Sequence, residues 1–180
     1  MALKSTIFKL QLQVSDLDRQ YYAEHTLTIA RHPSENDQRM MVRVLAFALN
    51  ADERLEFGRG LSSEDEPALW RKNYAGEIEQ WIEVGLPEER LLRKASGRAN
   101  EVVLMAYGGR AMEVWWAKES AGMTRLPRLK VLAIDDAALI ELAALAERNM
   151  QLQCTIQDGQ VWLGDGARTV EIAPRVLHGE

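Results

Sequence analysis

The chain has 180 residues, 47% of them hydrophobic and 27% charged, which is typical of one folded domain and argues against two full domains. A single cysteine, Cys154, excludes an internal disulfide framework and fits a reducing compartment. No apolar run is long enough for a signal peptide or a membrane span, so we expect a cytoplasmic protein that does not contact the membrane. The net charge of −5 disfavours a nucleic-acid-binding surface that covers the whole protein.

The N-terminal part of the sequence predicts a β-hairpin and then a helix. Apolar and polar residues alternate over 5–14 and again over 21–30, and the polar residues 15–18 between them suit a turn. Residues 31–35 contain the proline and the acid that are typical of a first helical turn, so we expect a helix to open there. Its apolar stripe at helical spacing is formed by Met41, Val44, Leu45 and Ala48.

The next segment predicts short strands at 54–57 and 68–71 and then a longer strand at 78–84. Alternation gives the longer strand two faces. One face carries Ile78, Gln80, Ile82 and Val84, and the other carries Glu79, Trp81 and Glu83. Carboxylates on one strand face often belong to a solvated surface. A carboxylate beside a tryptophan is instead partly desolvated, and it then needs a cation, a metal ion or a proton.

A basic helix is expected after this strand. Gly85 and Pro87 end the strand, and proline suits the first turn of a helix over residues 87–97. Residues 90–130 contain nine Lys or Arg against three Glu, whereas the rest of the chain has 13 basic and 24 acidic residues. This asymmetry predicts one basic surface on an otherwise acidic protein, unless the basic side chains pair internally.

The C-terminal part predicts further strands and one more helix. Strands are expected at 101–107, at 111–118 and at 129–134, the second of them carrying adjacent tryptophans. Two acids at 135–136 cap a helix, and a meander of antiparallel strands that turns at 158–159 closes the chain. The sequence therefore predicts a mixed α/β protein.

From residue 34 onward the predicted order is helix, three strands, helix and strand, which is the order of the PD-(D/E)XK nuclease core. That superfamily places an Asp at the start of the second core strand and an acid-x-Lys on the third. Asp65 lies eighteen residues before Glu83, and residues 82–85, Ile-Glu-Val-Gly, resemble Ile-Glu-Val-Lys with a glycine in place of the lysine. A basic residue on the next helix can reach the same space, and Lys94 is our candidate for it.

Longer stretches give a more specific resemblance, which covers essentially the whole chain. Together they resemble the YaeQ family of bacterial proteins at residues 1–4, 27–35, 51–55, 65–67, 81–87 and 155–159. The resemblance implies a single domain over residues 1–180 with a restriction-endonuclease-like αβββαβ core at roughly 32–134. An N-terminal hairpin and C-terminal antiparallel strands are added to this core.

The chemistry that the nuclease resemblance implies is hydrolysis of phosphodiesters in DNA or RNA, assisted by Mg²⁺ or Mn²⁺. The expected catalytic residues are Asp65, Glu83 and Lys94, and the expected metal ligands are Asp65, Glu66 and Glu83. Glu35 and Glu79 are expected as accessory acids, and Arg90, Arg93 and Arg98 as nucleic-acid-binding residues.

Three interpretations are left open by the sequence. The first is a metal-dependent nuclease. The second is a catalytically degenerate relative that binds nucleic acid or a transcription or translation partner, because fold analogy does not establish function. The third gives the carboxylates a structural role or a part in another enzyme. The sequence leaves open the choice between DNA and RNA, the cleavage specificity, the pathway and the oligomeric state.

Overall fold

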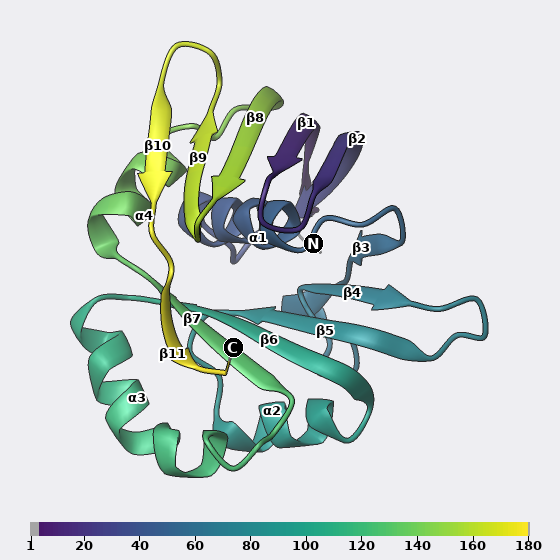
Figure 1. Cartoon of the computed structure of the whole chain (residues 1–180), viewed down its shortest axis with the longest axis vertical. Helices are drawn as coiled ribbons and strands as arrows, with labels where there is room; N and C mark the ends of the chain where they lie inside the picture. Colours follow the sequence, from purple (N-terminus) through teal and green to yellow (C-terminus); the bar gives the residue numbers. More distant parts are fainter. Residues whose placement is uncertain (1–3, 180) are drawn as a thin grey trace. The chain divides into compact units, whose positions relative to one another are not determined.

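The structure, a computed structural model, describes residues 4–179 apart from the side chain of Ser62. In this range the chain forms two mixed sheets and four α-helices, which confirms the predicted mixed α/β class (Figure 1). The chain divides into two compact units, Met1–Ala51 with Ala137–Pro174 and Asp52–Asp136 with Arg175–Glu180. Compactness and independent folding are different properties, so the single domain expected over residues 1–180 stays a prediction.

The first unit contains a five-stranded sheet in the order β10-β9-β8-β1-β2. Its strands are β1 Thr6–Asp16, β2 Tyr21–Arg31, β8 Asn149–Gln157, β9 Gln160–Gly164 and β10 Thr169–Ile172. The predicted N-terminal hairpin is confirmed, because β1 and β2 pair antiparallel over their full lengths. The predicted C-terminal meander is confirmed in β8, β9 and β10. In addition, β8 pairs in parallel with β1, and that pairing joins the N-terminal hairpin and the meander of β8, β9 and β10 in one sheet.

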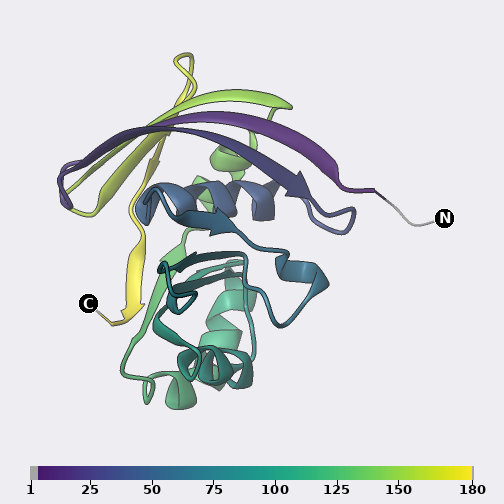
Figure 2. The same ribbon diagram turned by 90° about the vertical axis from the view of Figure 1, so that its right-hand side faces the viewer.

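Helix α1 (Asp37–Leu49) lies against one face of this sheet, which arches over it in Figure 2. The Asn36 side chain caps the helix by accepting a hydrogen bond from the backbone N–H of Arg39 at 2.9 Å. The expected start at residues 31–35 is therefore too early, because Arg31 ends β2 and residues 32–35 form a turn before the cap. Helix α4 (Asp136–Ala143) follows the two acids as predicted.

The second unit contains a six-stranded sheet in the order β11-β7-β6-β5-β4-β3. Its strands are β3 Leu55–Phe57, β4 Leu69–Lys72, β5 Ile78–Val84, β6 Ala99–Tyr107, β7 Leu129–Ile134 and β11 Arg175–His178. The central strands β5, β6 and β7 are parallel, and β3, β4 and β11 pair antiparallel with their neighbours. The interior strand predicted at residues 78–84 is confirmed.

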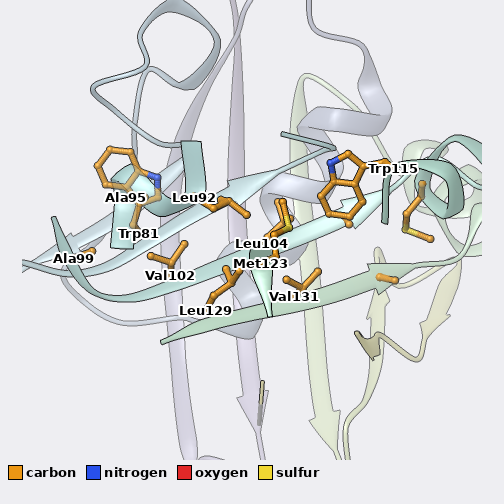
Figure 3. Close-up of a cluster of buried hydrophobic side chains, with 13 residues drawn as sticks. Trp81, Leu92, Ala95, Ala99, Val102, Leu104, Trp115, Met123, Leu129 and Val131 are labelled. Atoms are coloured by element: carbon orange, nitrogen blue, oxygen red, sulfur yellow. The ribbon is translucent and has the colours of Figure 1, made fainter. Parts of the chain in front are cut away.

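Helices α2 (Glu89–Ser96) and α3 (Arg110–Met123) cover one face of the second sheet (Figure 1). Their buried side chains form a core with those of the strands, in which Trp81, Leu92 and Ala95 lie together near one end and Trp115 near the other (Figure 3). This packing fixes α2 against β5, because a fully buried side chain of Leu size stabilises by about 1.5–3 kcal/mol.

The expected strand at residues 111–118 is wrong, because these residues lie within α3. Strands β6 and β7 pair in parallel, with Val102 opposite Leu129, and parallel strands need a long crossover that is usually a helix. Trp115 is a core residue of this helix, and its indole N–H donates to the backbone oxygen of Pro87 at 2.6 Å.

Candidate functional site

The candidate site begins at the carboxyl end of β5, where Trp81 and Glu83 share the face of the strand that α2 covers. Trp81 is only 4% exposed, and its indole N–H donates to Oε1 of Glu83 at 3.0 Å. The Glu83 carboxylate is thereby held in a defined orientation beside an apolar ring. This is the partly desolvated carboxylate that the strand pattern predicts.

Gly85 then turns the chain out of the strand. Its φ is +107°, while its backbone N–H still donates to the backbone oxygen of Met105 at 2.9 Å. A lysine would be strained in this left-handed conformation, so a glycine is required where the nuclease motif has its lysine.

A cavity of about 130 Å³ opens beside Glu83. One wall is the 3₁₀ turn η1 (Gly60–Ser62) with the segment that follows it, the second is helix α2, and the base is β5. The cavity is lined by Gly60, Leu61, Ser63, Glu64, Trp81, Glu83, Leu91, Lys94, Ala95 and Arg98. The site therefore contains two carboxylates and two cations.

Asp65 is joined to this cavity through the same two cations. Its Oδ1 lies 3.8 Å from Nζ of Lys94 and 3.9 Å from a guanidinium nitrogen of Arg98. The Asp65 side chain is 80% exposed, so the pairing is loose and screened by solvent. Of the three predicted catalytic residues, Glu83 and Lys94 line the cavity, whereas Asp65 lies outside its lining and is connected to it through Lys94 and Arg98.

Arg98 connects the charged groups to the core. Its guanidinium carbon lies 5.0 Å from the ring centroid of Trp81, a cation–π arrangement, and Trp70 meets the same indole edge-on at 6.0 Å. A guanidinium held over an aromatic ring has few orientations available to it. Arg98 is therefore a positioned cation at the cavity.

Glu66 and Glu79 have other partners. Glu66 forms an ion pair with Arg59. Glu79 accepts hydrogen bonds from Arg54 at 2.8 Å and from Arg71 at 3.0 Å, and the bond from Arg54 is the main cause that lowers the pKa of Glu79. Neither acid is among the residues that line the cavity.

A register shift in the β4–β5 pairing accompanies the different position of Glu79. Arg71 pairs with Gln80, but the next residue, Lys72, pairs with Ile78 and skips Glu79. Such a bulge re-aims a side chain. The expectation that Glu79 joins Glu83 at one site is therefore not met.

Glu35 belongs to the first unit and lies just before α1 rather than within it. Its buried carboxylate pairs with Arg39 and Arg43. Burial is the largest influence on Arg43 and lowers the pKa of its guanidinium, while Glu35 opposes that change. These contacts give Glu35 a structural role in fixing the start of α1.

The expected three-carboxylate metal group is absent from the described range. Between residues 4 and 179, no three His, Cys, Asp or Glu side chains gather closely enough to hold a metal ion. Glu83 lines the cavity, whereas Asp65 is connected to it only through Lys94 and Arg98. Mg²⁺ is commonly held by one or two carboxylates, with waters and substrate phosphate completing its shell, so the Glu83 carboxylate is compatible with such an ion.

The arginines expected to bind nucleic acid are each close to an acid. Arg90 lies 3.7 Å from Glu64 and 3.8 Å from Glu88, and Arg93 lies 3.3 Å from Glu89. Arg98 pairs with Asp65, as described above. All three arginines are therefore paired within the protein, which is the alternative to a free basic surface that the sequence left open.

Sequence reasoning missed the segment from Gly60 to Glu64 as a wall of the cavity. It lacks a helical or strand period, and its only signal is the acid that precedes Asp65. Leu91 was missed for another reason, because the facing of a short helix depends on where its cap lies. Separately, no helix in the described part of the chain is both long enough and apolar enough to cross a membrane.

Comparison with known proteins gives one consistent result. The model of the YaeQ protein family matches residues 1–174. A Salmonella typhi protein described as "Uncharacterized protein YaeQ" is 48% identical over 172 residues, which cover 96% of this chain and 95% of that protein. A protein of the same description from Escherichia coli (strain K12) is 46% identical with the same coverage.

Two solved structures are also similar over their whole length. The crystal structure of YaeQ protein from Xanthomonas axonopodis pv. citri has a TM-score of 0.94 at 48% identity, covering 98% of this chain and 99% of that chain. The YaeQ protein from Pseudomonas syringae gives a TM-score of 0.94 at 39% identity, covering 98% and 97%. This chain belongs to the YaeQ family.

Proposed function

We propose that the protein is a divalent-metal-dependent phosphodiester hydrolase that acts on DNA or RNA in the cytoplasm, with the cavity beside Glu83 as its catalytic site. The observation that carries the proposal is that Lys94 and Glu83 line one cavity while Asp65 pairs with Lys94 at 3.8 Å. Carboxylates can hold a metal ion that assists hydrolysis of a phosphodiester, and a lysine can stabilise the charge that develops on the phosphate.

The order of elements supports a PD-(D/E)XK relationship. Along the chain α1, β3, β4, β5, α2 and β6 follow each other in the order of that core, interrupted only by η1. Glu83 lies on β5, the strand in the third position, while Asp65 lies in the turn a few residues before β4 rather than at the start of that strand. The positive φ of Gly85 explains why the motif's lysine is missing there, and Lys94 supplies a cation from the next helix.

Asp65 and Glu83 are the residues that would hold Mg²⁺ or Mn²⁺. A bound divalent ion supplies a Lewis acid for the phosphate and lowers the pKa of a bound water. The Trp81 N–H fixes the Glu83 carboxylate so that it keeps one orientation. Lys94 stabilises the charge that develops on the phosphate oxygens.

The charges of the site have to redistribute when substrate binds. Lys94 and Arg98 both lie within 4 Å of the Asp65 carboxylate. A phosphate that enters the cavity would offer these cations a second anion, and Asp65 would then be released from them to help hold the metal ion. Glu35, Glu66 and Glu79 are left out of this proposal because each is held by arginines elsewhere.

One observation favours a second function, a catalytically degenerate nuclease-like protein that binds nucleic acid or a transcription or translation partner. Gly85 has replaced the motif's lysine, and the exposed Asp65 is already paired with two cations. An acid that is neutralised in this way can survive as a structural contact after catalysis is lost.

Cleavage and metal binding together test the proposal. Full-length protein is incubated with single-stranded DNA, RNA and plasmid in Mg²⁺ and in Mn²⁺, and its thermal unfolding is followed with and without each ion. Cleavage that Glu83→Gln abolishes, together with a metal-induced rise in Tm, supports the hydrolase. A rise in Tm without any cleavage supports the degenerate binding protein instead.

A further inference from the structure

We propose that the cavity accepts the end of a single-stranded nucleic acid, or a short oligonucleotide, rather than the interior of a long duplex. This inference rests on the proposed phosphodiester hydrolysis and adds the substrate class. Three features carry it: the cations of the site are already paired, acids lie in and near the cavity, and it is closed on two sides.

The paired cations leave little attraction for a long polyanion. Proteins that bind long nucleic acids gain affinity mainly from Lys and Arg side chains that neutralise several phosphates. Here Arg90, Arg93 and Lys94 each lie within 4 Å of a carboxylate, and so does Arg98. A substrate phosphate must compete with these acids, so only one or two phosphates are engaged favourably.

The acids in and near the cavity would disfavour additional phosphates. Three acids that pair with Lys94, Arg98 or the nearby Arg90 are well exposed: Glu64 by 60%, Asp65 by 80% and Glu88 by 73%. Glu64 also lines the cavity itself. A duplex would bring flanking phosphates of two strands against these carboxylates, whereas a chain end brings the fewest.

The shape of the cavity also favours an end. About 130 Å³ accommodates a phosphate with its attached groups, well below the 300–1,000 Å³ that is usual for a drug-sized ligand. The segment after Gly60 closes one side and Leu91, on α2, the other. The interior of a polymer has to leave a site in two directions, whereas an end needs only one exit.

The indole at the base does not supply a stacking platform. Trp81 is 4% exposed, with Arg98 over its ring and Trp70 at its edge. Single-stranded nucleic acids are bound along their length by exposed aromatic rings that stack with successive bases. Recognition at this cavity therefore depends on the phosphate, and the cavity offers no exposed aromatic ring that would bind an extended strand.

The proposed reaction is the hydrolysis of one phosphodiester bond. The oxygen of a water molecule bonds to phosphorus, the bond from phosphorus to the leaving sugar oxygen breaks, and that oxygen takes a proton. The second proton of the water is released to solvent. The products are a terminal nucleotide with a phosphate group and a shortened chain with a free hydroxyl.

Circular and linear substrates separate an end-directed enzyme from an internal one. Full-length protein with Mg²⁺ or Mn²⁺ is given a dinucleotide, a short linear oligonucleotide, circular single-stranded DNA and plasmid. We expect the first two to be cut and the circles to be left intact. Cleavage of the circles at a rate similar to the linear strand overturns the inference while it upholds the hydrolase, and no cleavage of any substrate overturns the hydrolase itself.

The salt dependence of substrate binding gives a second readout. With one or two phosphates engaged on a single strand, the logarithm of affinity should fall against the logarithm of salt with a slope of about −0.7 to −1.4. A slope near about −4, which corresponds to some six phosphates, would contradict the inference.

Removing negative charge near the cavity tests whether these acids select the substrate. The double variant Glu64→Gln with Glu88→Gln leaves Arg90 without its two acids. It should bind a longer single strand about fivefold more tightly than wild type, because each exposed charge contributes at most about 1 kcal/mol. Glu53→Gln removes an exposed carboxylate outside the cavity lining and is the matched control. Equal effects of the two changes would mean that these acids do not select the substrate.

Discussion

The proposed metal site makes a sharp prediction for two substitutions at one cavity, Glu83→Gln and Lys94→Met. Glu83→Gln keeps an oxygen that can accept the Trp81 N–H, so it removes the charge with little change in shape. At a concentration of one hundred times Kd, Mg²⁺ should stabilise the wild-type fold by about 2.7 kcal/mol. For a chain of this size that is a rise in Tm of about 5–10 °C, and Glu83→Gln should lose most of it.

Lys94→Met should behave differently. It removes a cation that lies 3.8 Å from Asp65, so the affinity for Mg²⁺ should stay the same or rise by up to about fivefold, the factor that about 1 kcal/mol of repulsion represents. Both variants should lose cleavage, because the lysine acts on the charge of the transition state. Thermal melts over a series of Mg²⁺ concentrations, beside gel cleavage assays, measure the two effects separately. A wild-type Tm that Mg²⁺ does not change, or an equal rise in Glu83→Gln, would refute the assignment of Glu83 as a ligand.

Three further results are expected from residues outside the cavity. The pKa of Glu79 is lowered in the folded state, so its ion pairs stabilise the fold at pH values above the ordinary pKa of 4.5. This contribution is lost as the pH falls through the lowered pKa. The Tm difference between wild type and Glu79→Gln should therefore shrink below about pH 4.5 and disappear in strong acid. Trp115→Phe removes the hydrogen bond to the Pro87 oxygen and should lower the free energy of unfolding in urea by about 1–3 kcal/mol, whereas an unchanged midpoint would mean that the bond contributes nothing. Burial raises the pKa of Cys154 to about 12, so the thiol should not react with Ellman's reagent at pH 8 until the protein unfolds.

Strands and local turns were predictable where a short-range pattern fixes them. The hairpin of β1 and β2 follows from alternation on both sides of a polar turn, and the turn at Asp158 and Gly159 has the positive φ angles that its two residues suit. Strand β5 was found with its bounds, because its alternation is regular and a glycine ends it. These features depend on neighbours in the sequence alone.

Other features depend on partners that lie far apart in the sequence. Nothing local shows that β8 pairs in parallel with β1, or that β11 joins β7 in the second sheet. The adjacent tryptophans of α3 resemble a strand in composition, and only the parallel pairing of β6 with β7 requires a helix there. The position of Glu79 depends in the same way on a bulge that two strands form together.

For the candidate site, the sequence was a better guide to which residues lie near one another than to which of the charged side chains are paired. Asp65, Glu83 and Lys94 were expected together; Glu83 and Lys94 line one cavity, and Asp65 lies outside its lining but pairs with Lys94. The three arginines of the basic segment were expected as a free surface or as internal pairs, and they are paired with acids that all precede that segment in the chain. A sum over sequence intervals cannot detect such pairing, because Glu64 and Asp65 lie well before the segment they neutralise.

The position of the lysine links the chemistry of this site to its core. At residue 85 a lysine side chain would require a backbone conformation that costs an L-residue about 1–2 kcal/mol, while the glycine there allows the chain to leave β5 and enter α2. Lys94 therefore reaches the cavity only because α2 is packed on β5 through Leu92, Ala95 and Trp81. Trp81 takes part in that packing and also orients Glu83, so one side chain holds both the helix that carries the cation and the carboxylate. A lysine on the strand would be positioned by the backbone alone, whereas the position of Lys94 depends on the hydrophobic core, so loss of packing at Trp81 should disturb the charges of Lys94 and Glu83 together.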